Sequence, residues 1–520
     1  MNTFLSFSQD KGMKTNVGKG AFVLIVSGLV CKFFGGLFRL PLTNIIGIEG
    51  IGVFQMVMSI YSLALVFVSG GVTTALSKLV SSARARGDYG KINSYLGWAL
   101  TFSIGLSFLF SVVFLLFSNQ ISSLQGASEG ASSYKILALL LPLGALVGVF
   151  RGLIQGYENM NPTAVSQIVE QVSKLAFGLI FAYALGGRGL GSGVAGAFWG
   201  ITLSELFACL YLGFVAFKKN KINLSLMQRR EFLSATLPLT FGGAVIPLTH
   251  AIEGLFIVGL LQQSGLMRES ATALYGLQTG VVGAILNFPL IISLSVAISL
   301  LPNLSFLVEK GDCSGQKNLV AKSFSSMWFL LIPLVFGIMA VSKSLYPIIY
   351  PTTMQKYLAV AVQLTSVVGI SIICTAVMQY LVALLQANGF YKYSMIFNII
   401  GGIAKVSMIF ILAPISKIGI FSIAISNIVL SAIVSTCALL KLGHLVKIPF
   451  FDIALPLLAS FVMLLVVRIF LSLIGGVGGL VLSIVVGMAV YFTLALPLSM
   501  RYYIFFINKF GFKKKQNSIN

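Results

Sequence analysis

Long apolar stretches separated by short polar segments make up most of the chain. Each apolar stretch is about 20 residues long, the length that an α-helix needs to cross a bilayer. Fourteen can be placed, at 20–43, 51–76, 94–117, 134–157, 163–186, 193–217, 233–262, 273–302, 323–346, 358–386, 394–413, 418–440, 453–474 and 480–500. The pattern predicts an all-α integral membrane protein with about 14 transmembrane helices.

The composition supports this class and excludes a large soluble protein. The 520 residues are 57% hydrophobic and 9% charged, and the mean hydropathy is +0.98, whereas a soluble domain carries roughly 25% charged residues. A net charge of +22 would suit a nucleic-acid partner, but most Lys and Arg fall on alternate loops. This positive-inside bias predicts cytoplasmic N- and C-termini, basic loops that contact anionic membrane lipids, and no nucleic-acid partner.

The chain contains a weak internal repeat. Four pairs of positions match at a nearly constant offset of about 225 residues: Ser77–Asp88 with Leu301–Asp312, Gln155 with Gln386, Lys174 with Lys405, and the basic loop from Lys218 with that from Lys441. The repeat predicts two six-helix lobes of one topology, residues 1–217 and 218–440, related by an axis along the membrane normal. Residues 441–520 would then add two helices and a basic cytoplasmic tail.

Among the ionisable side chains inside these apolar stretches, five bases and three acids most need an explanation. They are Lys32, Arg39, Arg151, Lys174 and Lys405, with Glu170, Glu205 and Glu253. A charge at the bilayer centre costs about 2.5–3.5 kcal/mol on insertion scales, so such groups usually face a polar cavity or pathway. Because bases outnumber acids, we expect a hydrated cavity with surplus positive charge, suited to an anionic, phosphate-bearing substrate.

The spacing of these residues suggests local partners. Arg151 and Gln155, and likewise Glu170 and Lys174, are four residues apart and share a helix face. The Glu170–Lys174 pair is either a self-neutralised structural pair or a pair that opens to bind substrate. Arg39 either lines the cavity beside Lys32 or extends to the outer headgroups.

The candidate sites follow from these positions. The predicted substrate-binding residues are Lys32, Arg39, Arg151, Gln155, Glu170, Lys174, Glu253 and Lys405. His250 lies three residues before Glu253, and His titrates near neutrality, so His250, Glu253 and Glu205 are candidates for proton or ion coupling. A plain hydrogen-bonding role for His250 is the alternative. No metal-ligand spacing and no nucleotide-binding loop occurs, so we expect no metal, no cofactor and no enzyme activity.

Three stretches carry a resemblance to a known family: Cys31–Gln55 (CKFFGGLFRLPLTNIIGIEGIGVFQ), Ser77–Asp88 (SKLVSSARARGD) and Arg151–Lys174 (RGLIQGYENMNPTAVSQIVEQVSK). They resemble the multidrug/oligosaccharidyl-lipid/polysaccharide exporter superfamily, in its branch of stage V sporulation protein B and the lipid II flippases. The resemblance implies two six-helix lobes plus two helices in a bacterial plasma membrane. It also implies export of an undecaprenyl-diphosphate-linked saccharide such as lipid II by alternating access, for peptidoglycan and in this branch for spore cortex. First-helix bases would line the cavity, and Arg39 fits that role better than Lys32.

Other functions remain open at this point. The runner-up is a cation-coupled multidrug exporter, which should have a cavity dominated by carboxylates. A non-transporting scaffold for cell-wall synthases is a third, although the short loops offer little docking surface. An integral-membrane glycosyltransferase would need clustered carboxylates in an outer loop, and none is present.

Overall fold

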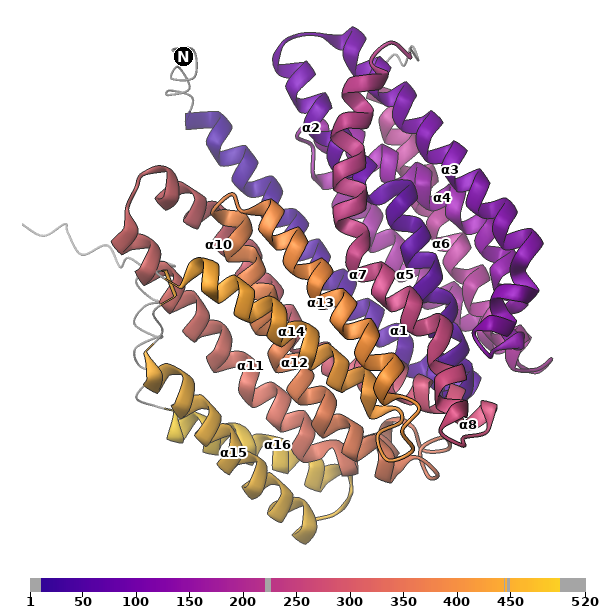
Figure 1. Ribbon diagram of the computed structural model, residues 1–520, viewed down its shortest axis with the longest axis vertical. Helices are drawn as coiled ribbons and strands as arrows, with labels where there is room; N and C mark the ends of the chain where they lie inside the picture. The colour runs from indigo at the N-terminus through magenta and orange to yellow at the C-terminus, as the bar shows by residue number, and fades with distance from the viewer. Residues whose placement is uncertain (1–10, 220–225, 444, 447–448, 496–520) are drawn as a thin grey trace, which may run out of the picture. The chain divides into compact units, whose positions relative to one another are not determined.

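The computed structural model describes residues 11–219, 226–443, 445–446 and 449–495, which are almost entirely helical. Its helices follow in chain order (Figure 1): α1 (Lys11–Leu65), η1 (Val66–Gly70), α2 (Gly71–Ala85), α3 (Tyr89–Leu124), η2 (Ser128–Gly130), α4 (Ala131–Gly156), α5 (Asn161–Gly186), α6 (Leu190–Lys219), α7 (Arg229–Gln263), α8 (Arg268–Gly276), η3 (Leu277–Val282), α9 (Gly283–Leu286), α10 (Leu290–Glu309), α11 (Cys313–Ile349), α12 (Leu358–Ala387), α13 (Tyr391–Leu412), α14 (Phe421–Leu442), α15 (Phe450–Leu473) and α16 (Gly476–Leu494). The described residues contain no strand, so the predicted all-α membrane fold is confirmed.

Thirteen helical segments of the described residues are long and apolar enough to cross a membrane. The count differs from the predicted 14 because the first two predicted spans form one continuous segment, Val26–Ala85. Inside it, Pro41 removes a backbone donor, and Gly47 adopts a positive φ of 74° that breaks the helical geometry of α1. The two predicted spans therefore lie on either side of a bend.

Two π-helical turns interrupt the second and the eighth predicted spans. η1 joins α1 to α2 in the second predicted span, and η3 joins α8 to α9 in the eighth. A π-turn leaves one residue out of the regular ladder and is frequently found at functional sites. These two spans are counterparts in the predicted repeat. By contrast α7, which contains Pro238 and Pro247, runs unbroken from Arg229 to Gln263.

The chain divides into two compact units. Unit 1 comprises the described residues of Met1–Ala284 and Gly402–Ser426, and unit 2 those of Ile285–Gly401 and Asn427–Asn520. In unit 1, apolar side chains of α2, α3, α4, α6 and α7 pack into one core. In unit 2, one core joins α10, α11, α12 and α14, and a second joins α11, α15 and α16. The predicted lobes 1–217 and 218–440, with residues 441–520 added, were defined by the internal repeat and not by packing. This division stays a prediction.

Candidate functional site

A group of polar side chains on α4 and α5 forms the first network inside unit 1. Arg151 of α4 donates from Nη2 to Oε2 of Glu170 on α5 at 2.8 Å, and from Nε to the Ser166 hydroxyl at 3.2 Å. Gln171 donates from Nε2 to Oε1 of Glu170 at 3.1 Å. Both side chains of the ion pair are largely buried. Each oxygen of the Glu170 carboxylate therefore has a donor, and Arg151 is its counter-ion.

This arrangement shows that the predicted local pairs were wrong. Glu170 pairs with Arg151 on the neighbouring helix instead of with Lys174 one turn away. Arg151 in turn contacts Ser166 and Glu170 rather than Gln155, which is only partly buried. The reason is geometric: a guanidinium offers several donors in a fixed fork, and α4 places it against the Ser166–Glu170 face of α5.

Lys174 takes no part in the ion pair between Arg151 and Glu170. Its ammonium lies over the ring of Phe38 on α1, 5.8 Å from the centroid. It interacts electrostatically with Glu170 and Glu205, and with Arg39, which repels it. The Lys174 side chain is partly exposed. Lys174 is thus a base with no carboxylate within ion-pair distance among the described residues.

Close packing of α5 on α6 brings Glu205 into this network. A side chain at Gly200 of α6 would collide with the backbone of Gly178 on α5, and one at Gly196 would collide with the Phe181 carbonyl. Small residues allow such backbone contact, which is the usual way in which helices associate in a membrane. Glu205 is buried there, near Glu170, Arg151 and Lys174.

A second network joins α7 to α13 within unit 1. The Lys405 ammonium lies 2.8 Å from the Glu253 carboxylate, and both side chains are almost completely buried, 1% and 3% exposed. His250 Nδ1 lies 3.4 Å from Lys405 Nζ and 3.8 Å from Glu253, but its side chain is half exposed. Phe256 packs on Phe410, 5.4 Å between ring centroids, one turn further along. The structure therefore brings His250, Glu253 and Lys405 together and encloses the lysine.

The eight ionisable residues singled out in the sequence, Lys32, Arg39, Arg151, Glu170, Lys174, Glu205, Glu253 and Lys405, all fall within unit 1. The two buried pairs, Arg151–Glu170 and Glu253–Lys405, neutralise two bases and two acids. The bases outside these pairs are Lys32, Arg39 and Lys174, and the acid is Glu205. Lys32 is exposed on α1, and Arg39 is partly buried two turns further on. The surplus of positive charge is therefore concentrated on α1 and α5.

Three residues of the first network were missed by sequence reasoning. Ser166 and Gln171 bind the ion pair, and Tyr61, on the second half of α1, interacts electrostatically with Glu205, Glu170 and Arg151. Gln171 stands beside Glu170 in the sequence and could have been included. Nothing in the sequence around Tyr61 indicates that it meets α4 and α6.

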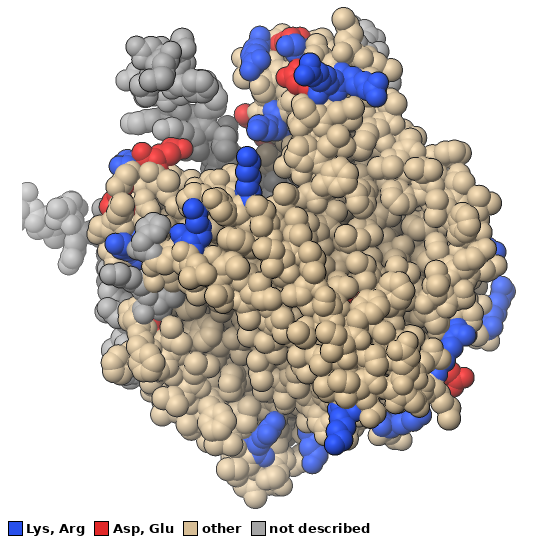
Figure 2. Space-filling view, viewed as in Figure 1, with Lys and Arg blue, Asp and Glu red and all other residues tan. Residues whose placement is uncertain are grey.

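The surface agrees with a membrane-spanning bundle. Over α3 to α6, on the right of Figure 2, charged side chains gather near the helix ends, and a broad uncharged band lies between them. Such a band is the surface that a lipid environment requires.

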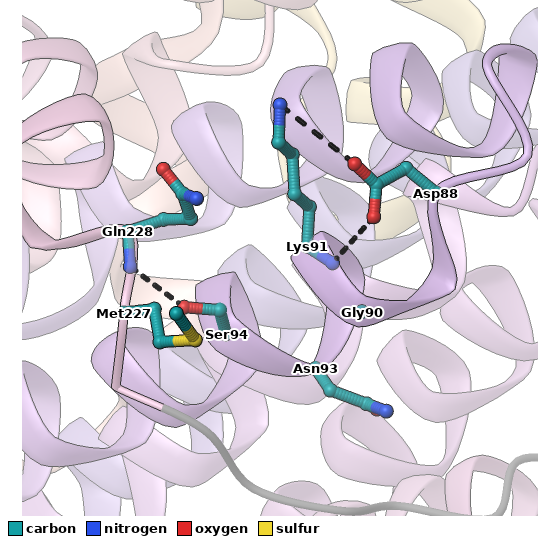
Figure 3. Close-up of a pocket in the computed structure, with 7 residues that line it drawn as sticks. All are labelled: Asp88, Gly90, Lys91, Asn93, Ser94, Met227 and Gln228. Carbon is teal, nitrogen blue, oxygen red and sulfur yellow. Dashed lines mark hydrogen bonds and ion pairs between the residues drawn. The ribbon is translucent and has the colours of Figure 1, made fainter.

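A small pocket lies outside the apolar segments, at the start of α3 (Figure 3). It encloses about 410 Å³ and is lined by Asp88, Gly90, Lys91, Asn93, Ser94, Met227 and Gln228. Asp88 caps α3 by accepting from the Lys91 backbone at 3.0 Å, and the Ser94 hydroxyl accepts from the Gln228 backbone at 2.8 Å. These contacts fix the turn between α2 and α3, so the polar groups of the pocket serve helix capping and chain docking.

Together, the long apolar helices and the enclosed ionisable side chains define a multi-pass membrane protein. Residues 17–308 match the polysaccharide biosynthesis protein family, and the chain belongs to that family. It is 28% identical to stage V sporulation protein B of Bacillus subtilis (strain 168) over 453 residues, 82% of each chain.

Two further relatives agree with this placement. The chain is 24% identical to the lipid II flippase MurJ of the same organism over 363 residues, 65% of this chain and 66% of that one. A solved structure titled "Lipid II flippase MurJ, inward closed conformation" shares the fold with a TM-score of 0.73 at 14% identity, covering 94% of this chain and 100% of that one. The family resemblance predicted from the three sequence stretches is confirmed, while the roles of the individual site residues stay predictions.

Proposed function

We propose that this chain is a flippase that moves an undecaprenyl-diphosphate-linked saccharide of the lipid II type from the inner to the outer leaflet by alternating access. Its relatives include a lipid II flippase and a sporulation protein, which supports peptidoglycan synthesis, including spore cortex, as the process served. In this proposal the chain performs no bond chemistry and hands its cargo to cell-wall synthases. Both termini lie on the cytoplasmic side, as the distribution of Lys and Arg indicates.

One observation in particular favours an anionic cargo. Outside the two buried ion pairs, Lys32 on α1 and Lys174 on α5 form no ion pair within the residues that the structure describes, and Glu205 is the one remaining acid of the eight. A diphosphate in hydrocarbon needs such cationic groups, and an inside-negative potential would assist its outward movement by about 2.3 kcal/mol per charge per 100 mV. A cationic drug would meet the same bases as a barrier. In this proposal Lys32, Arg39 and Lys174 contact the diphosphate, whereas Glu253 and Lys405 hold α7 and α13 together.

Complementation tests the proposal. In a strain that lacks its own flippase, the wild-type chain should restore growth and raise the amount of lipid II that is accessible to a labelling reagent on the outer leaflet. Arg39→Ala and Lys174→Ala should each abolish both effects while immunoblots show normal protein in the membrane. Lys135→Ala, an exposed lysine at the start of α4, is the matched control and should behave as wild type. Full activity of both site variants would contradict the cationic site.

A further inference from the structure

The predicted cytoplasmic end of α7 is held on α3 by polar and aromatic contacts. The Trp98 indole of α3 donates from Nε1 to the Leu226 carbonyl at 2.8 Å, and the Arg229 guanidinium lies over the Trp98 ring, 5.5 Å from its centroid. One turn into α7, Phe232 is completely buried in the core of unit 1 and packs edge-on against Phe102 of α3. The segment before α7 and its first turn are therefore docked on the first half of the chain.

Farther along, α7 packs against α1 and α2 at positions that carry no side chain. A Cβ atom at Gly71 of α2 would lie 2.6 Å from the backbone nitrogen of Thr240, and one at Gly254 of α7 would collide with the Ser59 hydroxyl of α1. Such close approach of backbones at small residues is the usual way in which helices associate in lipid. The middle of α7 is therefore also bound to the first half of the chain.

The predicted outer end of α7 and the start of α8 are bound as closely. Arg268 of α8 donates from Nε to the Gly126 carbonyl at 2.5 Å, and its Nη2 atom lies 3.2 Å from the Glu129 carboxylate of η2. A Cβ atom at Gly276 of α8 would collide with the Ile48 carbonyl of α1, directly after the bend. α7 and α8 therefore contact the first half of the chain from one end to the other.

These contacts bear on which helices move during transport. The internal repeat assigns α7, α8 and η3 to the lobe formed by residues 218–440. If that lobe rocked against residues 1–217, these helices would have to part from α1 at the outer end, or from α3 at the inner end, in each half of the cycle. Packing instead places them in unit 1 with α1–α6. Closely packed interfaces hold discrete arrangements and do not deform continuously, so we expect this one to stay intact.

We infer that α7, α8 and η3 move together with α1–α6 as one body during flipping, so that packing and not the sequence repeat sets the moving parts. The chain then passes from this body to the rest after η3, where α9 ends at Leu286 and α10 begins at Leu290. The tripeptide between them ends with Pro289, whose missing backbone donor interrupts a continuous helix. The inference rests on the proposed function, because it concerns the alternating access that flipping requires.

Disulfide cross-links inside this body test the inference. A Cβ atom at Gly254 would lie 3.3 Å from Cβ of Ser59, and one at Gly280 of η3 would lie 3.3 Å from Cβ of Ile51, close to the separation of about 3.5–4.5 Å in a disulfide. The variants Ser59→Cys/Gly254→Cys and Ile51→Cys/Gly280→Cys are made in the full-length chain after its five native cysteines are replaced by alanine. The single variants Ser59→Cys and Ile51→Cys, which cannot form these cross-links, control for the substitutions and the oxidant.

Each variant is reconstituted into liposomes with lipid II, oxidised, and assayed by outer-leaflet labelling before and after reduction, while a maleimide gel shift gives the cross-linked fraction. We expect cross-linking to change the rate by no more than about twofold, because no step of the motion parts these helices.

Rocking of the two six-helix lobes predicts the opposite result, a loss of about tenfold or more on oxidation that reduction reverses. That result, or the absence of cross-linking in both pairs, would overturn the inference and leave the flippase proposal standing. Failure of the wild-type chain to move lipid II would overturn both.

Discussion

Lys174 on α5 and Lys405 on α13 occupy corresponding positions of the predicted internal repeat, yet their surroundings differ. Lys405 is 0% exposed and lies 2.8 Å from the Glu253 carboxylate. Lys174 is partly exposed, and its ammonium lies over the Phe38 ring, 5.8 Å from the centroid. An enclosed ion pair fixes two helices to each other, whereas a base without a close carboxylate can still bind an anion.

The same contrast applies to the carboxylates. Glu253 has a cation at contact distance and a histidine nearby, while Glu205 has no base within ion-pair distance among the described residues. We therefore assign the α7–α13 network to structure and the α1–α4–α5–α6 network to transport. Each of the following predictions tests this assignment.

Breaking the enclosed pair should have the largest effect. Glu253→Ala leaves the Lys405 ammonium buried without a counter-ion, and we expect the free energy of unfolding to fall by about 3–5 kcal/mol. Thermal unfolding of the purified chain in detergent measures the loss. The double variant Glu253→Leu/Lys405→Leu should recover most of the stability, because apolar residues can replace a buried pair. Equal losses in the single and double variants would show that the pair itself is not the cause.

Exchanging each lysine for arginine compares the two sites directly. Lys405→Arg forces a larger, planar group into a fully enclosed position, and overpacking of this kind costs about 1–3 kcal/mol. Lys174→Arg keeps the charge at a partly exposed position, so we expect lipid II labelling within about threefold of wild type, or about 0.7 kcal/mol. Thermal unfolding reports on the first variant and outer-leaflet labelling on the second. The opposite pattern, with Lys174→Arg unstable and Lys405→Arg inactive but stable, would reverse the two assignments.

Adding a side chain at the contact between α5 and α6 should displace Glu205 from its network. Gly200→Ala places a methyl group against the backbone of Gly178, and we expect a loss of about 1–3 kcal/mol in stability, measured by thermal unfolding. Gly186→Ala, at the end of α5, has open space around the added carbon and is the matched control. A neutral result for Gly200→Ala would mean that the helices can separate without cost.

Removing His250 should change least. Its side chain is half exposed and lies 3.8 Å from Glu253, which already has Lys405 as counter-ion. We expect His250→Ala to change the free energy of unfolding by no more than about 0.5 kcal/mol, and to leave the pH dependence of flipping as in wild type. Rates measured between pH 6 and 8 in liposomes check the second point. A lost pH dependence would instead assign proton coupling to His250.

The sequence alone determined the class of the protein and the positions of its helices. Apolar runs of membrane length are set by local composition, because lipid demands an uninterrupted apolar surface whatever the neighbouring helices are. The same argument singled out the eight intramembrane charges, since each is costly wherever it points. The three stretches Cys31–Gln55, Ser77–Asp88 and Arg151–Lys174 likewise pointed to the family.

Only the tertiary structure decided which charges neutralise each other. Spacing along one helix predicted that Glu170 pairs with Lys174. In the structure, helix packing instead pairs Glu170 with Arg151, and pairs Glu253 with Lys405 across more than a hundred residues of sequence. An i,i+4 contact on a helix contributes only a few tenths of a kcal/mol. An ion pair at 2.8 Å with the guanidinium or ammonium of a neighbouring helix, in a water-poor interior, is a far stronger attraction than that contact. Pairing inside the bundle is therefore a property of how helices meet, which the order of residues does not reveal.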